Sequence, residues 1–219
     1  MDWYPLLNSI RISLLASILT FVLGIAAAYL LRNLPPFAKA IADCALTLPL
    51  VLPPTVVGFF LLTVLSPKSA LGSFIFDTFG TRIIMTWQAS ILAVAIVTFP
   101  LMYRTARASF ESFDKGLYDA GRTIGLSNWQ IFKYVTLPCC WKGISAGFVL
   151  SFARGLGEYG ATSMVSGYTP GRTATVSTTV YQLWREGNDA MAYKWVLVNV
   201  IISFAALLLL NYLERKDYR

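Results

Sequence analysis

LYDAGRTIGLSNWQIFKYVTLP, residues 117–138, is a polar stretch that interrupts an otherwise membrane-like sequence. Its residue pattern predicts two short helices, over about 114–124 and 128–136, with Gly125 at the corner between them. Glycine adopts the left-handed conformation that ends many helices without a steric penalty, so Gly125 fits that corner. The simplest interpretation is a helix-turn-helix between two membrane-spanning segments.

The second of these two helices has predicted signals at both ends. Ser127 and Gln130 have the spacing of a capping box, which starts a helix. Leu137-Pro138 is expected to stop the helix, because proline disfavours helical conformation in the residue before it. Three residues at helical spacing are expected to form one compact apolar face: Trp129, Phe132 and Val135. On physical grounds alone, an ordinary cytoplasmic loop on the membrane surface would explain the stretch equally well.

Three parts of the stretch together resemble the EAA loop of ABC-importer permeases: Asp119-Ala120-Gly121, Gly125 and Leu137-Pro138. The resemblance implies that the loop over 114–138 inserts into a groove on a separate ATPase subunit. The sequence departs from the family at two positions, since the family usually has Glu where Asp119 stands and Ala where Gly121 stands. The coupling residues that the resemblance implies are Asp119, Ala120, Gly121, Gly125, Leu126, Ser127, Trp129 and Pro138.

The composition indicates an integral membrane protein. Of the 219 residues, 56% are hydrophobic and 13% are charged, and the mean hydropathy of +0.61 is too high for a soluble domain of this length. Histidine is absent, which excludes imidazole metal sites and a histidine general base, so we expect neither a metal site nor a catalytic residue. Cys44, Cys139 and Cys140 are interpreted as packing residues, because the two adjacent cysteines cannot form an unstrained bridge.

Five apolar runs are long enough to cross a hydrocarbon core, which needs roughly 20 helical residues. The predicted spans are 10–31, 41–65, 83–103, 144–165 and 195–213, within one all-α transmembrane domain over 1–219. The first span is too long for a signal peptide and is interpreted as an uncleaved helix. We expect a loop over 66–82 and a polar loop over 166–192. The second loop is expected to contain a short amphipathic helix, membrane-embedded or not, with four apolar residues on one side: Val176, Val180, Leu183 and Trp184.

Three prolines interrupt the second span within LPLVLPPTVVG, residues 48–58: Pro49, Pro53 and Pro54. They remove backbone donors and force kinks, which a bilayer tolerates only where protein or a water-filled cavity satisfies the freed carbonyl groups. Either this segment lines the transport pathway, with Pro53, Pro54 and Thr55 as candidate lining residues, or the kink serves packing alone.

The fourth span is the least lipid-like of the five, because it carries Arg154 and Glu158 among several glycines. A charge at membrane depth costs about 3 kcal/mol on insertion scales, so these side chains are expected to face the bundle interior and to pair across one helix face. The favoured interpretation is an ion pair that also holds a neighbouring helix. The alternative is that Arg154 contacts an anion in transit, with Arg154, Glu158 and Gly160 as pathway residues.

The distribution of Lys and Arg predicts the orientation of the spans. Eleven basic residues fall on one side of the predicted membrane: Arg32, Lys39, Arg104, Arg107, Lys115, Arg122, Lys133, Lys142, Arg215, Lys216 and Arg219. Five fall on the other side: Lys68, Arg82, Arg172, Arg185 and Lys194. The side with eleven is expected to be cytoplasmic, which places the N-terminus and the loop over 166–192 outside, and the C-terminus and the loop over 114–138 inside. Topology also explains the net charge of +7, so no nucleic-acid partner is expected.

Two further segments, LSFARGLGEYGAT at 150–162 and SGYTPGRTATVSTTVYQLW at 166–184, resemble the permease of molybdate and related oxyanion importers. LPLVLPPTVVGFFLL at 48–62 and FPLMYR at 99–104 resemble the same subunit. The resemblance implies a type I importer permease with a MetI-like fold in a bacterial plasma (inner) membrane. It also implies a homodimer surrounded by lipid, two cytoplasmic ABC ATPase subunits that hold ATP and Mg, and an extracytoplasmic oxyanion-binding protein.

The chain contains no G-x-x-x-x-G-K-[ST] phosphate loop, so we expect it to be no enzyme by itself and to carry no cofactor. The predicted function is ATP-driven import of a tetrahedral oxyanion, molybdate or tungstate, with residues 117–138 moving as a lever about Gly125. Sulfate permeases share the GEFGA-like segment, so a sulfate or thiosulfate permease stays an alternative. A secondary transporter driven by an ion gradient would explain the broken second span and the charged pair, but not the capped helix-turn-helix.

Overall fold

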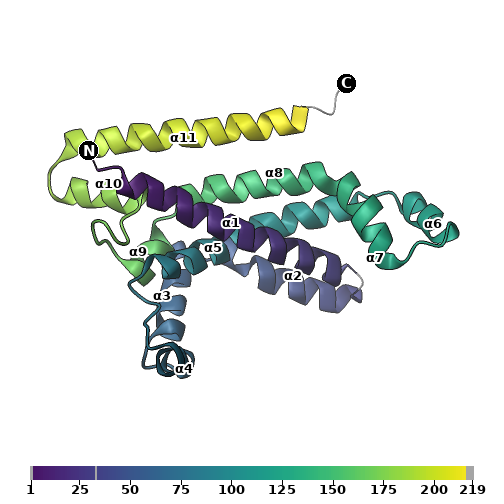
Figure 1. The fold of residues 1–219 in the computed structure, drawn as a ribbon, viewed down its shortest axis with the longest axis horizontal. Helices are drawn as coiled ribbons and strands as arrows, with labels where there is room; N and C mark the ends of the chain where they lie inside the picture. The colour runs from purple at the N-terminus through teal and green to yellow at the C-terminus, as the bar shows by residue number, and fades with distance from the viewer. Residues whose placement is uncertain (1, 33, 216–219) are drawn as a thin grey trace.

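The computed structural model describes residues 2–32 and 34–215, and its regular secondary structure in those residues is helical (Figure 1). Lys216 and Arg219, counted above for the orientation, lie outside the described residues. The helices in chain order are α1 (Tyr4–Leu31), α2 (Pro36–Val51), α3 (Pro54–Leu65), α4 (Ala70–Phe79), α5 (Trp87–Glu111), α6 (Lys115–Thr123), α7 (Asn128–Ile131), a π-helical turn η1 (Phe132–Thr136), α8 (Leu137–Leu156), α9 (Gly160–Ser166), α10 (Val176–Arg185) and α11 (Asp189–Arg215).

Four helical segments of the described residues are long and apolar enough to cross a membrane: Tyr4–Leu31, Trp87–Glu111, Asn128–Leu156 and Asp189–Tyr212. The bent pair of α2 and α3 makes a fifth if it is counted as one span. The first span begins earlier than expected, and Arg11 lies within it with its guanidinium carbon 3.2 Å from the centroid of the Trp87 ring. The third continues beyond the expected residue 103 to Glu111, because its apolar and small residues keep a buried face as far as Ala106.

The core lies where α5 packs between α1 and α8. Small residues allow these helices to approach closely, as is common between membrane helices. A Cβ on Gly24 of α1 would lie 2.9 Å from the Met102 Cγ of α5, and a Cβ on Gly147 of α8 would collide with the Thr105 hydroxyl of α5. Met102 is fully buried at this crossing. Helix α11, in contrast, lies at the edge of the bundle and packs on α8 and α10 (Figure 1).

The second span is broken rather than kinked. Helix α2 ends at Val51, Leu52 and Pro53 are extended, and α3 restarts at Pro54 with its axis turned by 107°. Proline suits the first position of a helix, where no N–H is required, so Pro54 begins α3. Pro49, in contrast, lies inside α2.

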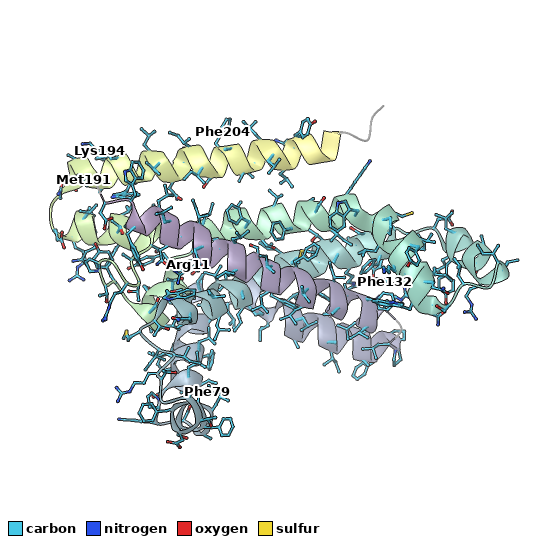
Figure 2. The ribbon with its side chains drawn as sticks, in the orientation of Figure 1. Arg11, Phe79, Phe132, Met191, Lys194 and Phe204 are labelled. Atoms are coloured by element: carbon cyan, nitrogen blue, oxygen red, sulfur yellow. The ribbon has the colours of Figure 1, made fainter. Side chains whose placement is uncertain are left out.

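Residues 66–82 contain α4, so the expectation of a plain loop was wrong. The Ser69 hydroxyl accepts a hydrogen bond from the Gly72 N–H at 2.9 Å, and Gly80 ends the helix with φ at 65°. These are ordinary start and stop signals for a helix. Together α3 and α4 form an arm that projects sideways from the bundle, with Phe79 near its tip (Figures 1 and 2).

The fourth span differs from the prediction at both ends. Leu137-Pro138 does not stop a helix, because α7, η1 and α8 run continuously from Asn128 to Leu156. Before Pro138 the helix widens to a π-helical turn, in which the Leu137 N–H donates to the Phe132 carbonyl, and Pro138 lies in the first turn of α8. At the other end the chain leaves α8 after Leu156, so the expected single helix over 144–165 is in fact α8 and the short α9.

The remaining expectations concern the amphipathic helix and the three cysteines. The amphipathic helix predicted within 166–192 is α10, which buries Val176 but leaves Trp184 exposed. Among the cysteines, which are free, Cys140 is buried, whereas Cys44 and Cys139 are exposed and so are not core packing residues. The start of α1 lies beside α10 at one end of the bundle, and α6 and α7 lie at the opposite end (Figure 1).

Candidate functional site

Helix α6 stands beyond the end of the bundle, and local capping fixes where it begins and where the next helix starts. The Asp114 carboxylate accepts the Gly116 N–H at 2.8 Å at the start of α6. Gly125 turns the chain with φ at 86°, as the sequence predicts. The predicted capping box is also present, because the Ser127 N–H donates to Gln130 Oε1 at 2.8 Å and the Gln130 N–H donates to Ser127 Oγ at 3.3 Å.

Helix α6 is held against α7 and the turn between them by a buried contact and by polar ones, among them a hydrogen bond from Arg122 Nη1 to Asn128 Oδ1 at 3.4 Å. A Cβ on Gly121 would lie 3.0 Å from Cγ1 of Ile131, which is fully buried. The Tyr118 hydroxyl donates to Asn128 Oδ1 at 2.8 Å, and an Arg122 guanidinium N–H donates to the Leu126 carbonyl at 3.3 Å. The helix-turn-helix is therefore a compact unit rather than a loose loop.

The outer face of this unit is exposed and partly apolar. Ile124 is 76% exposed and Trp129 is 66% exposed, although both are large hydrophobic residues. The residues implied for coupling divide into exposed ones, namely Asp119, Ala120, Gly125, Ser127, Trp129 and Pro138, and the buried Gly121 and half-buried Leu126. Trp129 and Phe132 lie on one side of the helix, as predicted, with ring centroids 5.5 Å apart, but Phe132 is buried whereas Trp129 is exposed.

An aromatic cluster that the sequence analysis missed joins this unit to the bundle. The Phe132 ring of η1 lies 4.2 Å from the Tyr29 ring of α1 and 6.1 Å from the Phe110 ring of α5, measured between centroids. Figure 2 shows Phe132 where the bundle meets α7. Residue spacing within the stretch could not have found this cluster, since its members come from three separate helices.

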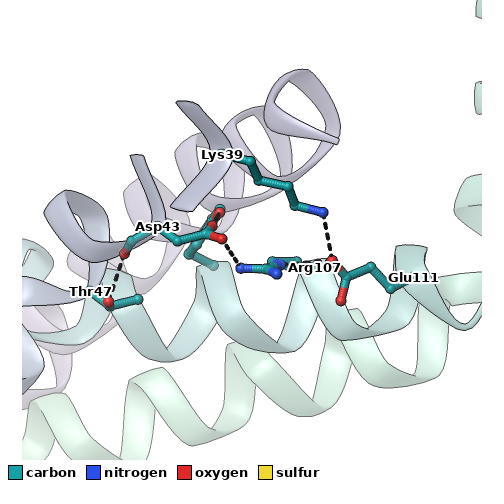
Figure 3. A network of polar contacts seen from close by, with 6 residues as sticks. Lys39, Asp43, Thr47, Arg107 and Glu111 are labelled. Atoms are coloured by element: carbon teal, nitrogen blue, oxygen red, sulfur yellow. Dashed lines mark hydrogen bonds and ion pairs between the residues drawn. The ribbon is translucent and has the colours of Figure 1, made fainter. Parts of the chain in front are cut away.

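A second missed feature is a polar network between α2 and α5 (Figure 3). Glu111 Oε1 lies 2.8 Å from Lys39 Nζ and 2.8 Å from Arg107 Nε. The Arg107 guanidinium also pairs with the Asp43 carboxylate, which accepts a hydrogen bond from the Tyr103 hydroxyl. Arg107 and Glu111 are four residues apart on one helix, a spacing that favours ion pairing and could have indicated half of this network.

The candidate pathway residues gather where the two broken spans meet. A Cβ on Gly160, the first residue of α9, would lie 3.0 Å from Pro54 Cβ and 3.1 Å from the Thr55 backbone nitrogen at the start of α3. Gly58 of α3 packs in the same way on the Ala161 backbone. The breaks in the two spans therefore lie side by side, as is typical of transporters that use discontinuous helices.

The ion pair predicted in the fourth span is present, but not on one helix. Arg154 Nη2 lies 2.9 Å from Glu158 Oε2, and Glu158 follows the end of α8. The other Glu158 oxygen, Oε1, accepts the Ala161 N–H at 2.9 Å and so satisfies a free donor at the start of α9. Glu158 is only 3% exposed, whereas the Arg154 side chain is 39% exposed. The pair therefore fixes the break between α8 and α9, and the Arg154 side chain stays partly exposed.

Within residues 2–32 and 34–215, no group of three or more Cys, Asp and Glu side chains is placed for metal binding. The arrangement offers an exposed, capped helix at one end and two broken spans that pack on each other at their breaks.

Residues 20–216 match the family described as binding-protein-dependent transport system inner membrane components. The chain belongs to this family. Two relatives are each 37% identical to this permease: the putative molybdenum transport system permease protein YvgM of Bacillus subtilis, over 97% of this chain and 92% of the relative, and the molybdenum transport system permease protein ModB of Escherichia coli K12, over 98% and 94%.

A probable sulfate transport system permease protein, cysT of Chlorella vulgaris, is 30% identical to this permease over 97% of the chain and 80% of the relative. Among solved structures, a chain of the inward-facing MetNI methionine ABC transporter superposes with a TM-score of 0.77 at 17% identity, and the match covers 100% of this permease and 98% of that chain. This permease therefore has the MetI-like, type I ABC-importer permease fold, as predicted.

Proposed function

We propose that this permease is the membrane-spanning subunit of an ATP-driven importer of molybdate, with tungstate as the chemically equivalent cargo. The observation that carries the substrate class is the 37% identity, over nearly the whole chain, to two relatives named as molybdenum permeases. The relative named as a sulfate permease matches at 30%, so sulfate or thiosulfate stays the second candidate. All four cargoes are tetrahedral oxyanions, and selectivity among them resides mainly in an extracytoplasmic binding protein.

The ATPase-coupling element is α6 with the turn that follows it. Asp119 and Ala120 of α6 and Trp129 of the following α7 are exposed, and both helices lie at one end of the bundle (Figure 1). They offer a surface for a groove on a separate ATPase subunit. That ATPase supplies the ATP and Mg, so the permease performs no hydrolysis of its own. The basic residues of the loop support a cytoplasmic position for α6, with the N-terminus outside and the C-terminus inside.

The pathway runs past the shared break of the second and fourth spans. Irregular backbone at membrane depth is tolerated where it is buried in protein or lines a cavity. Pro53 and Thr55 are exposed on one side of this break, and Arg154 presents its half-exposed guanidinium on the other. Because Glu158 already pairs with Arg154, the site offers an anion only a transient, low-affinity contact, which suits release. A second copy of the permease completes the pathway in a homodimer.

The test is purification of the tagged full-length permease, coexpressed with the ABC ATPase and binding protein of its own importer, followed by ATPase assays. We expect the ATPase subunit to copurify in equal amounts and its rate to rise with molybdate-loaded binding protein more than with sulfate-loaded protein. The variant Ala120→Asp on α6 should reduce copurification, whereas Pro170→Asp at the opposite end of the bundle should not. A permease that purifies alone and takes up oxyanion under an ion gradient would overturn the proposal in favour of a secondary transporter.

A further inference from the structure

An apolar groove of about 280 Å³ runs between α1 and α2, with α5 as its floor. Its walls are almost entirely hydrocarbon. They include Leu19 and Leu23 of α1, Leu46 and Pro49 of α2, and Ile96 and Phe99 of α5. The one hydroxyl in the lining, that of Thr20, donates to the Ser17 carbonyl at 3.1 Å. The groove therefore offers no unmet polar group to water or to a polar cargo, and it suits a hydrocarbon chain.

A smaller hollow of about 30 Å³ lies further along the same three helices and is basic. Its lining includes Arg32, Lys39 and Arg107. Lys39 and Arg107 are paired with Glu111 or Asp43, as described above, which leaves one positive charge in excess. That charge belongs to Arg32, whose guanidinium carbon lies 4.0 Å from the centroid of the Tyr29 ring and whose buried Nε has no hydrogen-bond acceptor.

The two hollows lie along the same three helices. In chain order the apolar groove comes first on α1 and α5, whereas the basic hollow comes first on α2. On α1, Leu23 is the last residue that lines the apolar groove, and Arg32, which directly follows α1, lines the basic hollow. The two residues are nine apart in sequence, which corresponds to about 14 Å at the helical rise. This distance is close to half of a hydrocarbon core of about 30 Å, so a basic hollow at the membrane surface would put the apolar groove at membrane depth. Exposed Leu34 and Phe37 beside the α1–α2 turn also suit the boundary between lipid and water.

We propose that this track binds one anionic phospholipid, with its phosphate on Arg32 and one acyl chain in the groove between α1 and α2. Basic pockets between membrane helices are the usual recognition sites for anionic head groups. A free phosphate would use Arg32 but not the groove, and a helix of a second copy would use the groove but leave the Arg32 donor unmet. Only a ligand with an anionic head and an apolar tail satisfies both parts.

The bound lipid would lie against the polar network between α2 and α5, on the half of the second span that precedes the break. Its head group would therefore contact both the first span and α2 at the end of the bundle where α6 stands. The lipid would thus lie between the broken second span and the rest of the bundle. The transport proposal does not require a lipid at this position.

The test is native mass spectrometry of the delipidated full-length permease, titrated with dioleoylphosphatidylglycerol or with dioleoylphosphatidylcholine. We expect one high-affinity phosphatidylglycerol per chain and weaker binding of phosphatidylcholine. Arg32→Gln should raise the Kd for phosphatidylglycerol about fivefold, the effect of one surface cation, and leave that for phosphatidylcholine unchanged. Arg32→Lys should retain most of the affinity. Arg104→Gln, which removes an exposed charge outside the track, is the matched control and should change the Kd less than twofold.

A groove variant separates the remaining occupants. Leu23→Trp fills the groove at a half-exposed position and should weaken binding of phosphatidylglycerol without changing the oligomeric state. Equal affinity for the two lipids, or an equal effect of Arg104→Gln and Arg32→Gln, would overturn the proposal. Displacement of the lipid by millimolar inorganic phosphate with no effect of Leu23→Trp would reduce the track to an anion site. Loss of dimer with unchanged lipid binding in Leu23→Trp would make the groove a protein interface instead.

Discussion

Gly121 shows at the scale of one residue how α6 is attached to α7. The EAA-like motif usually has alanine at this position, and the departure looks minor in sequence. In the structure, however, a Cβ here would lie only 3.0 Å from the Ile131 side chain, which is fully buried. The glycine therefore lets α6 approach α7 more closely than an alanine would without movement of Ile131, and the position of α6 depends on this contact.

We predict that Gly121→Val loosens α6 from α7. Overpacking at a buried contact costs typically 1–3 kcal/mol, and the displaced element here is short and exposed on its other side. Hydrogen exchange over 115–131 should therefore accelerate and copurification of the ATPase should fall, while the melting temperature of the membrane bundle stays nearly unchanged. Thr123→Val, which adds the same side chain at an exposed position of α6, is the control. Unchanged exchange in Gly121→Val would show that Ile131 gives way without cost.

Arg154 and Glu158 allow a second prediction at this scale. Because Glu158 is buried, removing only its partner leaves an uncompensated charge, which should cost on the order of 2 kcal/mol given the half-exposed guanidinium. We predict that Arg154→Gln lowers the melting temperature of the purified permease more than Glu158→Gln does, since the glutamine carbonyl can still accept the Ala161 N–H. The double variant should be more stable than the sum of the two single effects implies. Simple additivity would show that the two groups do not interact.

At the scale of elements, the sequence predicts helix ends well where local chemistry sets them. Gly125 and the Ser127–Gln130 box lie where expected, because a left-handed glycine and a capping box need only neighbouring residues. The effect of a proline on a helix is harder to predict from sequence, because it depends on where in the helix the proline lies. Pro54 starts a helix, Pro49 lies inside one, and Pro138 follows a π-helical turn that no residue pattern indicates.

The break between α8 and α9 was not predicted, for a different reason. The run over 144–165 is long enough for one membrane span, so the sequence predicts a single helix there. The chain leaves the helix because the Glu158 carboxylate pairs with Arg154 and accepts a hydrogen bond from the Ala161 N–H. Both interactions depend on the burial of Glu158 in the folded bundle. The contact between Gly160 and Pro54 was equally out of reach, since it joins residues of two distant spans. The candidate pathway residues could thus be chosen from the sequence, but the sequence could not predict which of them contact one another.

Gly125 gives the prediction that belongs to this scale, because it controls how α6 is joined to α7. Nothing lies within 4 Å of a Cβ placed on Gly125, so a substitution there would act through backbone strain at φ 86° and not through a clash. We predict that Gly125→Val severely reduces ATP-coupled uptake, since β-branched residues are strongly disfavoured at positive φ. Gly125→Asn should retain most uptake, because asparagine tolerates this conformation. Normal uptake by Gly125→Val, with the ATPase still bound, would rule out a lever that turns at this glycine.

At the scale of the whole molecule, the arm and α11 are parts of the described chain that leave large apolar side chains exposed. The arm of α3 and α4 projects from the bundle with Phe60, Phe74 and Phe79 exposed, and α11 exposes residues such as Phe204 along its outer side (Figure 2). In water such surfaces would cause association. In a membrane, lipid would cover them, and the proposed second copy of the permease would cover a further part.

The orientation of this assembly in the membrane is the last prediction. Helix α6 and the turn that contains Pro170 lie at opposite ends of the bundle, so they should face opposite sides of the membrane (Figure 1). The excess of Lys and Arg on the α6 side predicts that this side is cytoplasmic. In a variant without native cysteines, Pro170→Cys should therefore react with a membrane-impermeant maleimide in spheroplasts, and Thr123→Cys only after the membrane is permeabilised. The reverse pattern would place α6 outside, where no ATPase could reach it, and would refute the coupling proposal together with the orientation.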